Sequence, residues 1–330
     1  MSRHSVEQLV APVVAGVLVL VTLLALIGTA IRDPRPRDIA VGVVGPAPAV
    51  SQVTGALSAK APGVFAFTSY DSEDAARSAL DSRTIDGAVL LGQTPRIIVA
   101  GAAGDANTGV ITTVFGAALA SQAGGGPVPV EVVHPFAGGD AHGLVLFFLV
   151  LATLISTLVV GVGLLVRARE RGVTAWLGVT AVWALVAAAA GALVVDWISD
   201  WPYDAAGIVS VAALLALASL AVGTVIGGAA RLLGLPGLGL AALIAVLLDL
   251  VSSGGPAGSN FLPDAYRWMG PWMPAGQLYS ALRGALYFGG QGVGTPQLVL
   301  VGWLAAGLLL MTIAAGLTRR APKPVVAPAH

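Results

Sequence analysis

One carboxylate, Asp249, lies within an apolar run of the sequence that reads LIAVLLDLV. A charged side chain inside a membrane is costly, so an acid in such a run prompts a functional hypothesis. The downstream arginines Arg267 and Arg283 are basic side chains with which it could pair. We therefore treat Asp249 as a candidate for proton handling or ion pairing. The alternative is a hydrated carboxylate at the membrane interface, beside Ser252 and Ser253.

The segment that follows, residues 252–295, is rich in Gly, Pro, Trp and Tyr. Such aromatic side chains are typical of the headgroup level of a membrane, where residues 277–288 can form an amphipathic helix. Irregular backbone at membrane depth must instead be buried in protein or face a watery cavity. The segment is thus either an outer loop with an aromatic belt or a re-entrant element that lines a pathway. The candidate pathway or gating residues are Asp249, Arg283, Tyr279, Pro271, Pro274 and Asp196, the last of which closes an earlier apolar run.

Other reactive residue types lack partners at a useful spacing. His134, Asp140 and His142 are metal-ligand types, but they match no compact ligand motif, so a juxtamembrane loop is favoured over a metal site. The chain has no cysteine, which excludes disulfides and thiolate chemistry. Its two lysines, Lys60 and Lys323, lie outside any phosphate-binding loop. No histidine lies in an apolar run, so we expect no catalytic residues, no cofactor and no enzymatic activity.

The elements that must position these residues are apolar helices. Hydrophobic residues make up 56% of the 330 residues and charged residues only 10%, whereas soluble domains carry about 25% charged residues. A membrane span needs roughly 20 apolar residues. The first run, within residues 1–31, is too long for a cleaved signal peptide and predicts an anchor helix. A five-helix domain is expected over 143–318, with spans at 143–166, 174–195, 206–230, 235–251 and 296–318 and the re-entrant or interfacial segment at 261–290.

Arginines predict the orientation, because cytoplasmic loops carry an excess of Lys and Arg. Arg167, Arg169 and Arg171 follow the second run, and the tail 319–330 is also basic. With six spans these arginines share one side, although the arginines within 32–37 argue for the opposite side. We expect both termini in the cytoplasm and a multi-pass protein of the bacterial inner or plasma membrane. Arg167, Arg169 and Arg171 are also candidates for cytoplasmic coupling or for contact with anionic lipid.

Residues 32–142 differ from the apolar runs of the rest of the chain. Strand and helix patterns alternate there, as in a small open sheet with helices packed on it. We expect an α-helical polytopic membrane protein with six transmembrane helices and this stretch as an inserted extracytoplasmic α/β domain. Asp71 and Asp105 are the expected helix N-caps. Expected strands cover 39–44, 64–70, 88–91, 96–100 and 128–133, and expected helices cover 50–59, 71–83 and 106–122.

Two stretches carry a resemblance to a known family. The first is DSEDAARSAL at 71–80, followed by IDGAVLL at 85–91. The second begins at Leu262–Pro263 and continues with PWMP from Pro271 to Pro274, YSALR from Tyr279 to Arg283 and a glycine pair at 289–290. Together with the order of spans, they resemble ABC-2 type transporter permeases, in the YhgE/Pip-like branch of phage-infection-protein-like and nitrosoguanidine-resistance-like membrane proteins. By topology the likeness covers almost the whole chain.

The resemblance implies a permease or exporter component that moves hydrophobic or amphipathic substrates, works as a homodimer among membrane lipids and is driven by a separate ATPase subunit. The few polar residues in the later spans favour lipid-like cargo. The loop 167–172 is short for a coupling helix, so the ATPase subunit stays an open expectation. The alternative is a membrane scaffold or receptor whose outer domain binds a cell-envelope partner. Neither function involves nucleic acid.

Overall fold

The computed structural model describes residues 3–120, 125–140, 142–199, 201 and 205–320. Among them, five helical stretches are long and apolar enough to cross a membrane, and each lies within a few residues of a predicted run. The first predicted run belongs to α1 (Arg3–Ile31), whose described apolar part covers Gly16–Ile31. The tail beyond residue 320 lies outside the described residues. The five stretches are α5 (Leu144–Arg167), α6 (Val173–Ser199), α7 (Ala205–Leu233), the interrupted stretch Leu235–Ala257 and α12 (Gly294–Arg320).

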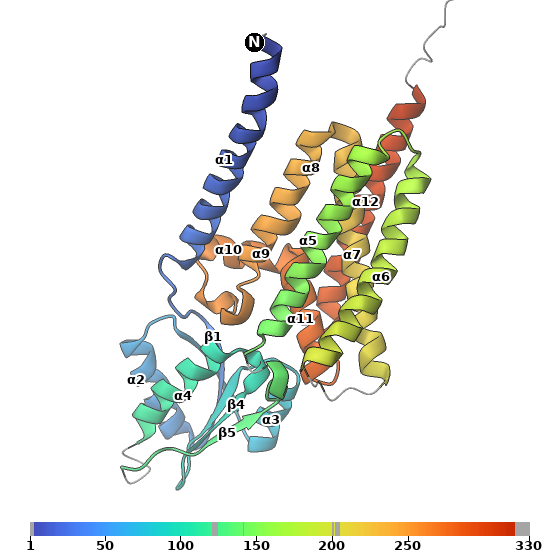
Figure 1. Cartoon of the computed structure of the whole chain (residues 1–330). Coiled ribbons are helices and arrows are strands. Elements are labelled where there is room, and N and C mark those ends of the chain that lie inside the picture. The colour runs from blue at the N-terminus through green and yellow to red at the C-terminus, as the bar shows by residue number, and fades with distance from the viewer. Residues whose placement is uncertain (1–2, 121–124, 141, 200, 202–204, 321–330) are drawn as a thin grey trace, which may run out of the picture.

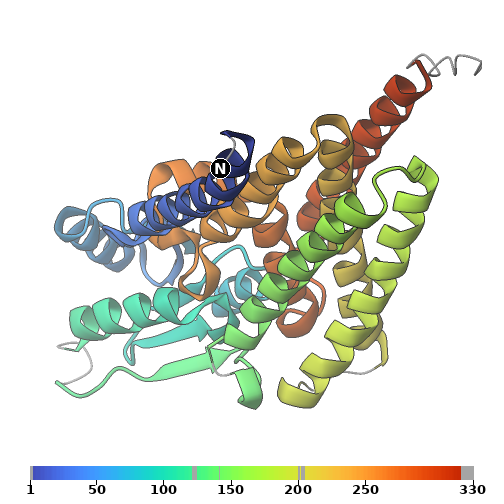
Figure 2. The ribbon, with the colours of Figure 1, turned by 45° about the horizontal axis from the view of Figure 1, so that its top comes forward.

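The long helices run alternately toward and away from a small β-sheet (Figure 1). The N-terminal end of α1 and the C-terminal end of α12 both lie far from the sheet. Helix α7 is central and packs against α5, α6 and α12. Helices α1 and α6 occupy opposite flanks in both views of the chain (Figure 2). The last turns of α1 attach it to the rest, because the Tyr266 hydroxyl donates to the Leu26 carbonyl at 3.0 Å and bonds the Thr29 hydroxyl at 2.7 Å.

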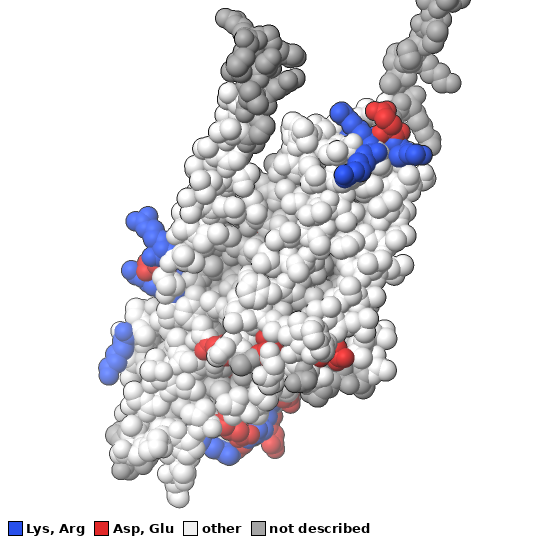
Figure 3. Space-filling view, in the orientation of Figure 1, with Lys and Arg blue, Asp and Glu red and all other residues white. Residues whose placement is uncertain are grey.

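Charged side chains avoid the middle of the helix bundle. Figure 3 shows them at the end of the bundle far from the sheet and around its sheet end, with an uncharged surface between. At the far end, Arg167, Arg169 and Arg171 are exposed beside Glu170. Apolar side chains such as Val159 and Leu185 are exposed between the two ends. An uncharged belt of this kind fits the hydrocarbon core of a membrane.

The sheet has five strands in the order β2-β1-β3-β4-β5. Strand β1 pairs in parallel with β2 and β3, β4 runs antiparallel to β3, and β5 is parallel to β4. All five predicted strands are therefore confirmed. The strands are β1 (Ile39–Val44), β2 (Phe65–Tyr70), β3 (Gly87–Leu90), β4 (Arg96–Ala100) and β5 (Val130–Val133).

Helices cover both faces of the sheet, because alternate strand residues point to opposite faces. On one face, α2 (Ala47–Lys60) and α4 (Asp105–Leu119) bury Leu57 and Phe115 against Val41 and Val43. On the other face, α3 (Glu73–Asp81) buries Leu80 against Ile98. Phe288, from the segment before α12, also packs in this second core. The sheet and these three helices are called the α/β unit below.

The predicted helix caps of the α/β unit are each displaced by one residue. At α3 the N-cap is Ser72 rather than Asp71, and the Ser72 hydroxyl accepts the Ala75 N–H at 3.1 Å. At α4 the N-cap position is Gly104, so Asp105 lies in the first turn instead. An acid in the first turn still complements the helix dipole.

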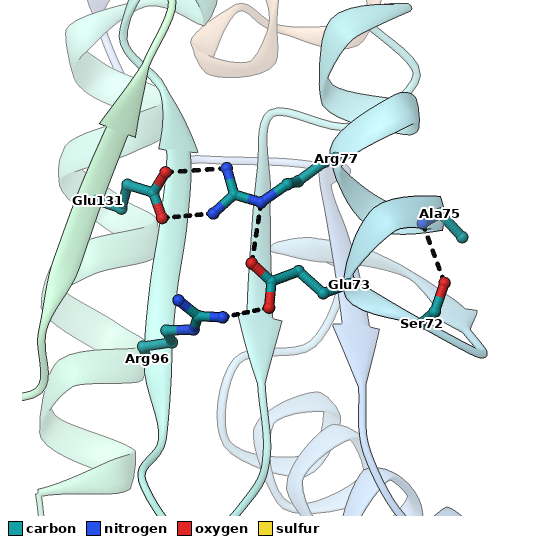
Figure 4. Close-up of polar contacts among 6 residues, drawn as sticks. All are labelled: Ser72, Glu73, Ala75, Arg77, Arg96 and Glu131. Carbon is teal, nitrogen blue, oxygen red and sulfur yellow. Dashed lines mark hydrogen bonds and ion pairs between the residues drawn. The ribbon is translucent and has the colours of Figure 1, made fainter.

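A cluster of ion pairs ties α3 across the sheet to its last strand (Figure 4). The Arg77 guanidinium contacts Glu131 of β5 through two bonds of 2.8 and 2.6 Å and also donates to Glu73 at 2.9 Å. Arg96 of β4 pairs with the other oxygen of Glu73. The two bonds to Glu131 lower the pKa of that carboxyl group. Linked, bidentate contacts of this kind hold geometry better than an isolated surface pair.

The segment between the interrupted stretch and α12 is folded and lies against the α/β unit. Asn260 donates to the Arg37 carbonyl at 2.8 Å and Arg37 donates to the Leu262 carbonyl at 2.9 Å. Trp268 and Trp272 are exposed as an aromatic belt requires, but Tyr279 is buried. The segment contains short 3-10 turns (Gly255–Ala257, Ser259–Phe261 and Gly270–Trp272), α10 (Asp264–Met269) and α11 (Pro274–Tyr287). Residues 252–293 are called the return segment below.

Helices α7 and α12 approach closely at Gly307. A Cβ atom at this position would overlap the Thr224 hydroxyl, whereas a Cβ at Gly302 of the same helix would meet nothing within 4 Å. We expect Gly307→Ala to lower the free energy of unfolding by about 1–3 kcal/mol, the usual cost of overpacking a close contact. Thermal unfolding of the full chain in detergent measures the loss. Gly302→Ala is the matched control, and equal stability of the two variants would contradict this packing.

Candidate functional site

The interrupted apolar stretch brings Asp249 to the start of α11. Helix α8 (Leu235–Ala242) leads into a π-helical segment, Leu243–Leu248, and α9 (Asp249–Ser252) follows directly. The Asp249 side chain is 0% exposed, and its two oxygens accept the Ala275 N–H at 2.8 and 2.7 Å. The first N–H groups of a helix have no partner within that helix. Asp249 therefore caps α11 from another helix, at the end where the helix dipole favours negative charge.

The structure contradicts the ion pair and the hydrated position suggested for Asp249, whereas proton handling stays a prediction. Arg267 pairs with Asp38 at 2.6 Å rather than with Asp249, and the Arg283 guanidinium lies 5.4 Å from the centre of the Tyr279 ring. Nor is the carboxylate hydrated at an interface, because it is fully buried. An acid can occupy this place because the N-terminus of α11 supplies the hydrogen bond that water would otherwise provide.

A polar cavity of about 290 Å³ lies between the return segment and the α/β unit, next to this cap. Three arginines line it, one from the α/β unit and two from the return segment, and no acid is among the described residues that form its wall. Ser252, Ser253 and Gly276 connect the wall to the Asp249 contact. The arginines are Arg83, Arg267 and Arg283, and the other polar lining residues include Ser259, Gln277, Tyr279 and Ser280.

Arg83 enters the cavity from the C-terminal end of α3. Its N–H bonds the Leu80 carbonyl at 3.0 Å and the Thr84 N–H bonds the Ala79 carbonyl at 2.8 Å, which is the Schellman pattern of helix termination. The residue that turns the chain in this motif has positive φ and is usually glycine. Arg83 has φ +62°, and a side chain in that conformation costs roughly 1–2 kcal/mol. The chain thus keeps an arginine where glycine would be easier.

The Arg83 guanidinium donates to the Ser280 carbonyl and to the Ser280 hydroxyl, both at 3.0 Å. Burial, together with repulsion from Arg283, lowers the pKa of Arg83 to about 10. Arg83 is still protonated at neutral pH, since that pKa lies well above 7. Burial also raises the pKa of Tyr279, which stays neutral beneath Arg283. The site therefore presents fixed positive charge.

An apolar groove adjoins this cavity. Pro271 lines the polar cavity, and the next residue, Trp272, lines a hollow of about 550 Å³ between α7 and α12. Leu298, Gly302 and Trp303 of α12 form much of that hollow. The Trp303 indole donates to the Trp272 carbonyl at 2.7 Å and so fixes the boundary between the two. Consecutive residues of the return segment thus line a polar and an apolar compartment.

The structure brings together four of the six predicted pathway residues and places a fifth beside them. Arg283, Tyr279 and Pro271 line the cavity, Asp249 caps the helix behind it, and Pro274 is the first residue of that helix. Asp196 does not belong to the site, because it is exposed near the end of α6.

The other candidate residues lie elsewhere. Asp140 does not form a metal site with the two histidines. Its carboxylate accepts the Val145 N–H at 2.8 Å, at the start of α5. His134 pairs with Asp81 at 2.7 Å, and His142 pairs with Asp105. The described residues contain no group of three side chains suited to a metal ion.

The predicted coupling patch is at the opposite end of the molecule. Arg167, Arg169 and Arg171 are exposed there, and Arg231 of α7 donates to the Arg171 carbonyl at 2.8 Å. The Trp176 indole donates to the Ala168 carbonyl at 2.9 Å. The short loop is therefore folded back onto the bundle, while its arginine side chains stay free to meet a partner or lipid.

Comparison with known proteins finds no matching family model and no matching curated protein. The site must therefore be interpreted from its own geometry. Sequence reasoning missed Arg83 and Ser280, which meet across 197 residues of chain. The available signal for Arg83 was an arginine, rather than glycine, at the last position of the predicted helix 71–83.

Asp249 can be tested for its capping role. We expect Asp249→Ala to lower the free energy of unfolding by about 1–3 kcal/mol, because the buried Ala275 N–H loses its acceptor. Asp249→Asn keeps one acceptor oxygen and is expected to retain most of the stability. Thermal unfolding of the full chain in detergent measures both variants, with the exposed Asp196→Ala as control. Unchanged stability of Asp249→Ala would contradict the capping role, and equal losses for both variants would show that α11 requires the charge itself.

Proposed function

We propose that this chain is an ABC-2-like permease or exporter component that moves hydrophobic or amphipathic substrates across a bacterial cell membrane. In this proposal α1 and the five later apolar stretches make six spans, both termini are cytoplasmic and the α/β unit lies outside. The chain works as a homodimer, and a separate ATPase subunit as the energy source stays open, because the loop 167–172 is short for a coupling helix.

The proposed orientation rests on the distribution of arginines. Arg167, Arg169, Arg171 and Arg231 gather at the end far from the sheet, in agreement with an excess of positive charge on the cytoplasmic side. The three arginines after α1 argue against it in the sequence, but two of them bond other parts of the chain. Arg37 donates to the Leu262 carbonyl, and Arg35 pairs with Asp33 at 2.9 Å.

The proposed transport role rests on one observation: two consecutive residues, Pro271 and Trp272, line the polar cavity and the apolar groove. An amphipathic molecule needs both environments at once, one for its polar end and one for its apolar body. Interrupted membrane helices commonly build transporter sites, since their free ends supply polar groups at membrane depth. Here the interrupted stretch ends at the cavity, with Ser252 and Ser253 in its wall.

A second candidate function, a receptor or scaffold for an envelope partner, is favoured by the edge strand β5. Val130 and Val132 of this strand are 45% and 54% exposed, and β5 pairs with β4 on one side. An exposed edge strand with apolar side chains can accept a strand from another protein. This function would use the α/β unit alone and would not require the cavity.

Topology can be tested with single cysteines, because the chain has none of its own. We expect a cysteine at Ser82, which is exposed at the end of α3, to react in intact cells with a maleimide that cannot cross membranes. A cysteine at Glu170, exposed at the far end, is expected to react only after the cells are opened. Labelling of both positions in intact cells, or of neither, would contradict the six-span arrangement.

Transport can be tested with a variant that fills the apolar groove. In cells that lack the chain, we expect amphipathic solutes to accumulate, and mass spectrometry of cells and medium measures them. The wild-type chain should restore export, whereas Gly302→Phe should restore it several-fold less, because Gly302 lines the groove. Gly316→Phe is the matched control on α12, since a Cβ at Gly316 also meets nothing within 4 Å. Unchanged solute levels in all strains, with an envelope protein co-purifying instead, would favour the receptor.

A further inference from the structure

Two of the three arginines in the cavity wall have no carboxylate partner in the part of the chain that the structure describes. Arg267 is neutralised, because Asp38 lies 2.6 Å and Asp264 3.6 Å from its guanidinium nitrogens. Arg83 and Arg283 form no such pair with any described carboxylate within 4.0 Å. Two guanidinium groups at one cavity thus lack a direct counter-charge.

Asp86 is the acid whose field reaches both of these arginines, and it does not cancel them. Its carboxylate lies behind the cavity wall, where it accepts from the Asn107 amide at 3.0 Å. Burial raises the pKa of Asp86, while Arg283 and Arg83 oppose that rise from a distance. Asp86 forms no ion pair within 4.0 Å with Arg83 or Arg283, so neither guanidinium has a direct carboxylate partner among the described residues.

Arg283 has unused hydrogen-bonding capacity. Its Nε atom is buried and has no hydrogen-bond partner among the described residues. The guanidinium lies over the Tyr279 ring and also contacts the Tyr279 hydroxyl, and these contacts leave Nε without a partner. A buried donor without an acceptor is costly, so a ligand that accepts from Arg283 would gain from filling this place.

Ser280 adds a donor of suitable geometry. Its hydroxyl oxygen accepts from Arg83, which leaves the hydroxyl hydrogen available to donate. Ser280 and Arg283 are three residues apart on α11, so their side chains lie on one face of the helix. The cavity therefore offers two guanidinium groups and a hydroxyl to one occupant.

We propose that the cavity formed by Arg83, Ser280 and Arg283 binds a phosphate group, carried as a monoester or diester by an amphipathic molecule. A phosphate presents several acceptor oxygens to planar guanidinium forks, more than one carboxylate offers to two arginines. The cavity of about 290 Å³ is near the lower end of ligand pockets, as suits a headgroup rather than a whole lipid. The inference rests on the proposed function for its amphipathic carrier, whose apolar part would lie in the groove beyond Trp272.

Binding can be measured on the purified full chain without any transport step. The probes are inorganic phosphate, glycerol 3-phosphate, and phosphatidylglycerol in nanodiscs otherwise made of phosphatidylcholine. Titration calorimetry reports the soluble probes, and native mass spectrometry reports retained phosphatidylglycerol. We expect Arg283→Gln to weaken binding on the order of tenfold or more, the effect of losing a hydrogen bond to a charged group. Arg283→Lys should weaken it less, because the charge remains.

Arg169→Gln is the matched control, since Arg169 is exposed at the other end of the molecule and should leave binding unchanged. Thermal unfolding of each variant separates lost binding from lost fold. If the chain retains phosphatidylglycerol and Arg283→Gln abolishes that retention, the site binds a lipid headgroup. If the chain in pure phosphatidylcholine nanodiscs binds glycerol 3-phosphate as strongly as it binds phosphatidylglycerol, the site binds a soluble ester.

Absence of binding by all three probes, or binding that Arg283→Gln and Arg169→Gln weaken equally, would overturn the proposal. The result is independent of the export assay. If binding depends on Arg283 but the chain exports nothing, the phosphate site stands and the exporter function is overturned. If the chain exports solutes but shows no such binding, the exporter function stands and the phosphate site is overturned.

Discussion

The carboxylate of Asp249 accepts the Ala275 N–H in a part of the protein that solvent does not reach. Neither group could be left alone there, because a buried carboxyl group and a buried N–H both need hydrogen-bond partners. Their contact therefore fixes where α11 begins and how it lies against the interrupted helix. Helix α11 carries Ser280 and Arg283, so the position of the cavity wall depends on an interaction outside the cavity. The π-helical segment directly before Asp249 is part of the same arrangement. Its wider turn changes the direction in which the Asp249 side chain leaves the helix.

The other half of the site comes from the α/β unit, and several contacts hold it in place. Asn260 joins the return segment to Arg37, and Asn107 of α4 donates to the Asn260 side chain at 3.1 Å. On the opposite face of the sheet Phe288 packs with α3, and the Arg83 guanidinium lies 5.3 Å from its ring centre. The α/β unit is thus attached on both sides of the cavity. Movement of this unit relative to the helices would change the distance between Arg83 and Arg283, and so the affinity for an anion.

Local patterns explain why most of the elements could be predicted from the sequence. The β-branched run Ile39–Val44 and long apolar runs such as Leu144–Arg167 depend only on nearby residues and on the solvent they must meet. The caps were each displaced by one residue, because Asp71 and Ser72 are adjacent and both can cap. The partner of Asp249 could not be predicted in the same way. A backbone N–H leaves no mark in a sequence, so arginines looked like the natural partners. Arg83 and Ser280 were missed for a related reason, since only the docking of two distant segments brings them together.

The proposed cargo follows from the depth at which the two compartments meet. Trp268 and Trp272 are 73% and 63% exposed on the return segment, and exposed tryptophans are typical of the headgroup level of a membrane. The arginine-lined cavity lies on the sheet side of Trp272, and the apolar groove runs from Trp272 along α12. A lipid in the surrounding leaflet has the same order of parts, with its phosphate at the headgroup level and its chains below. A molecule could therefore pass from the leaflet into the site without turning over and without exposing its apolar part to water, which is the costly step for an amphipathic solute.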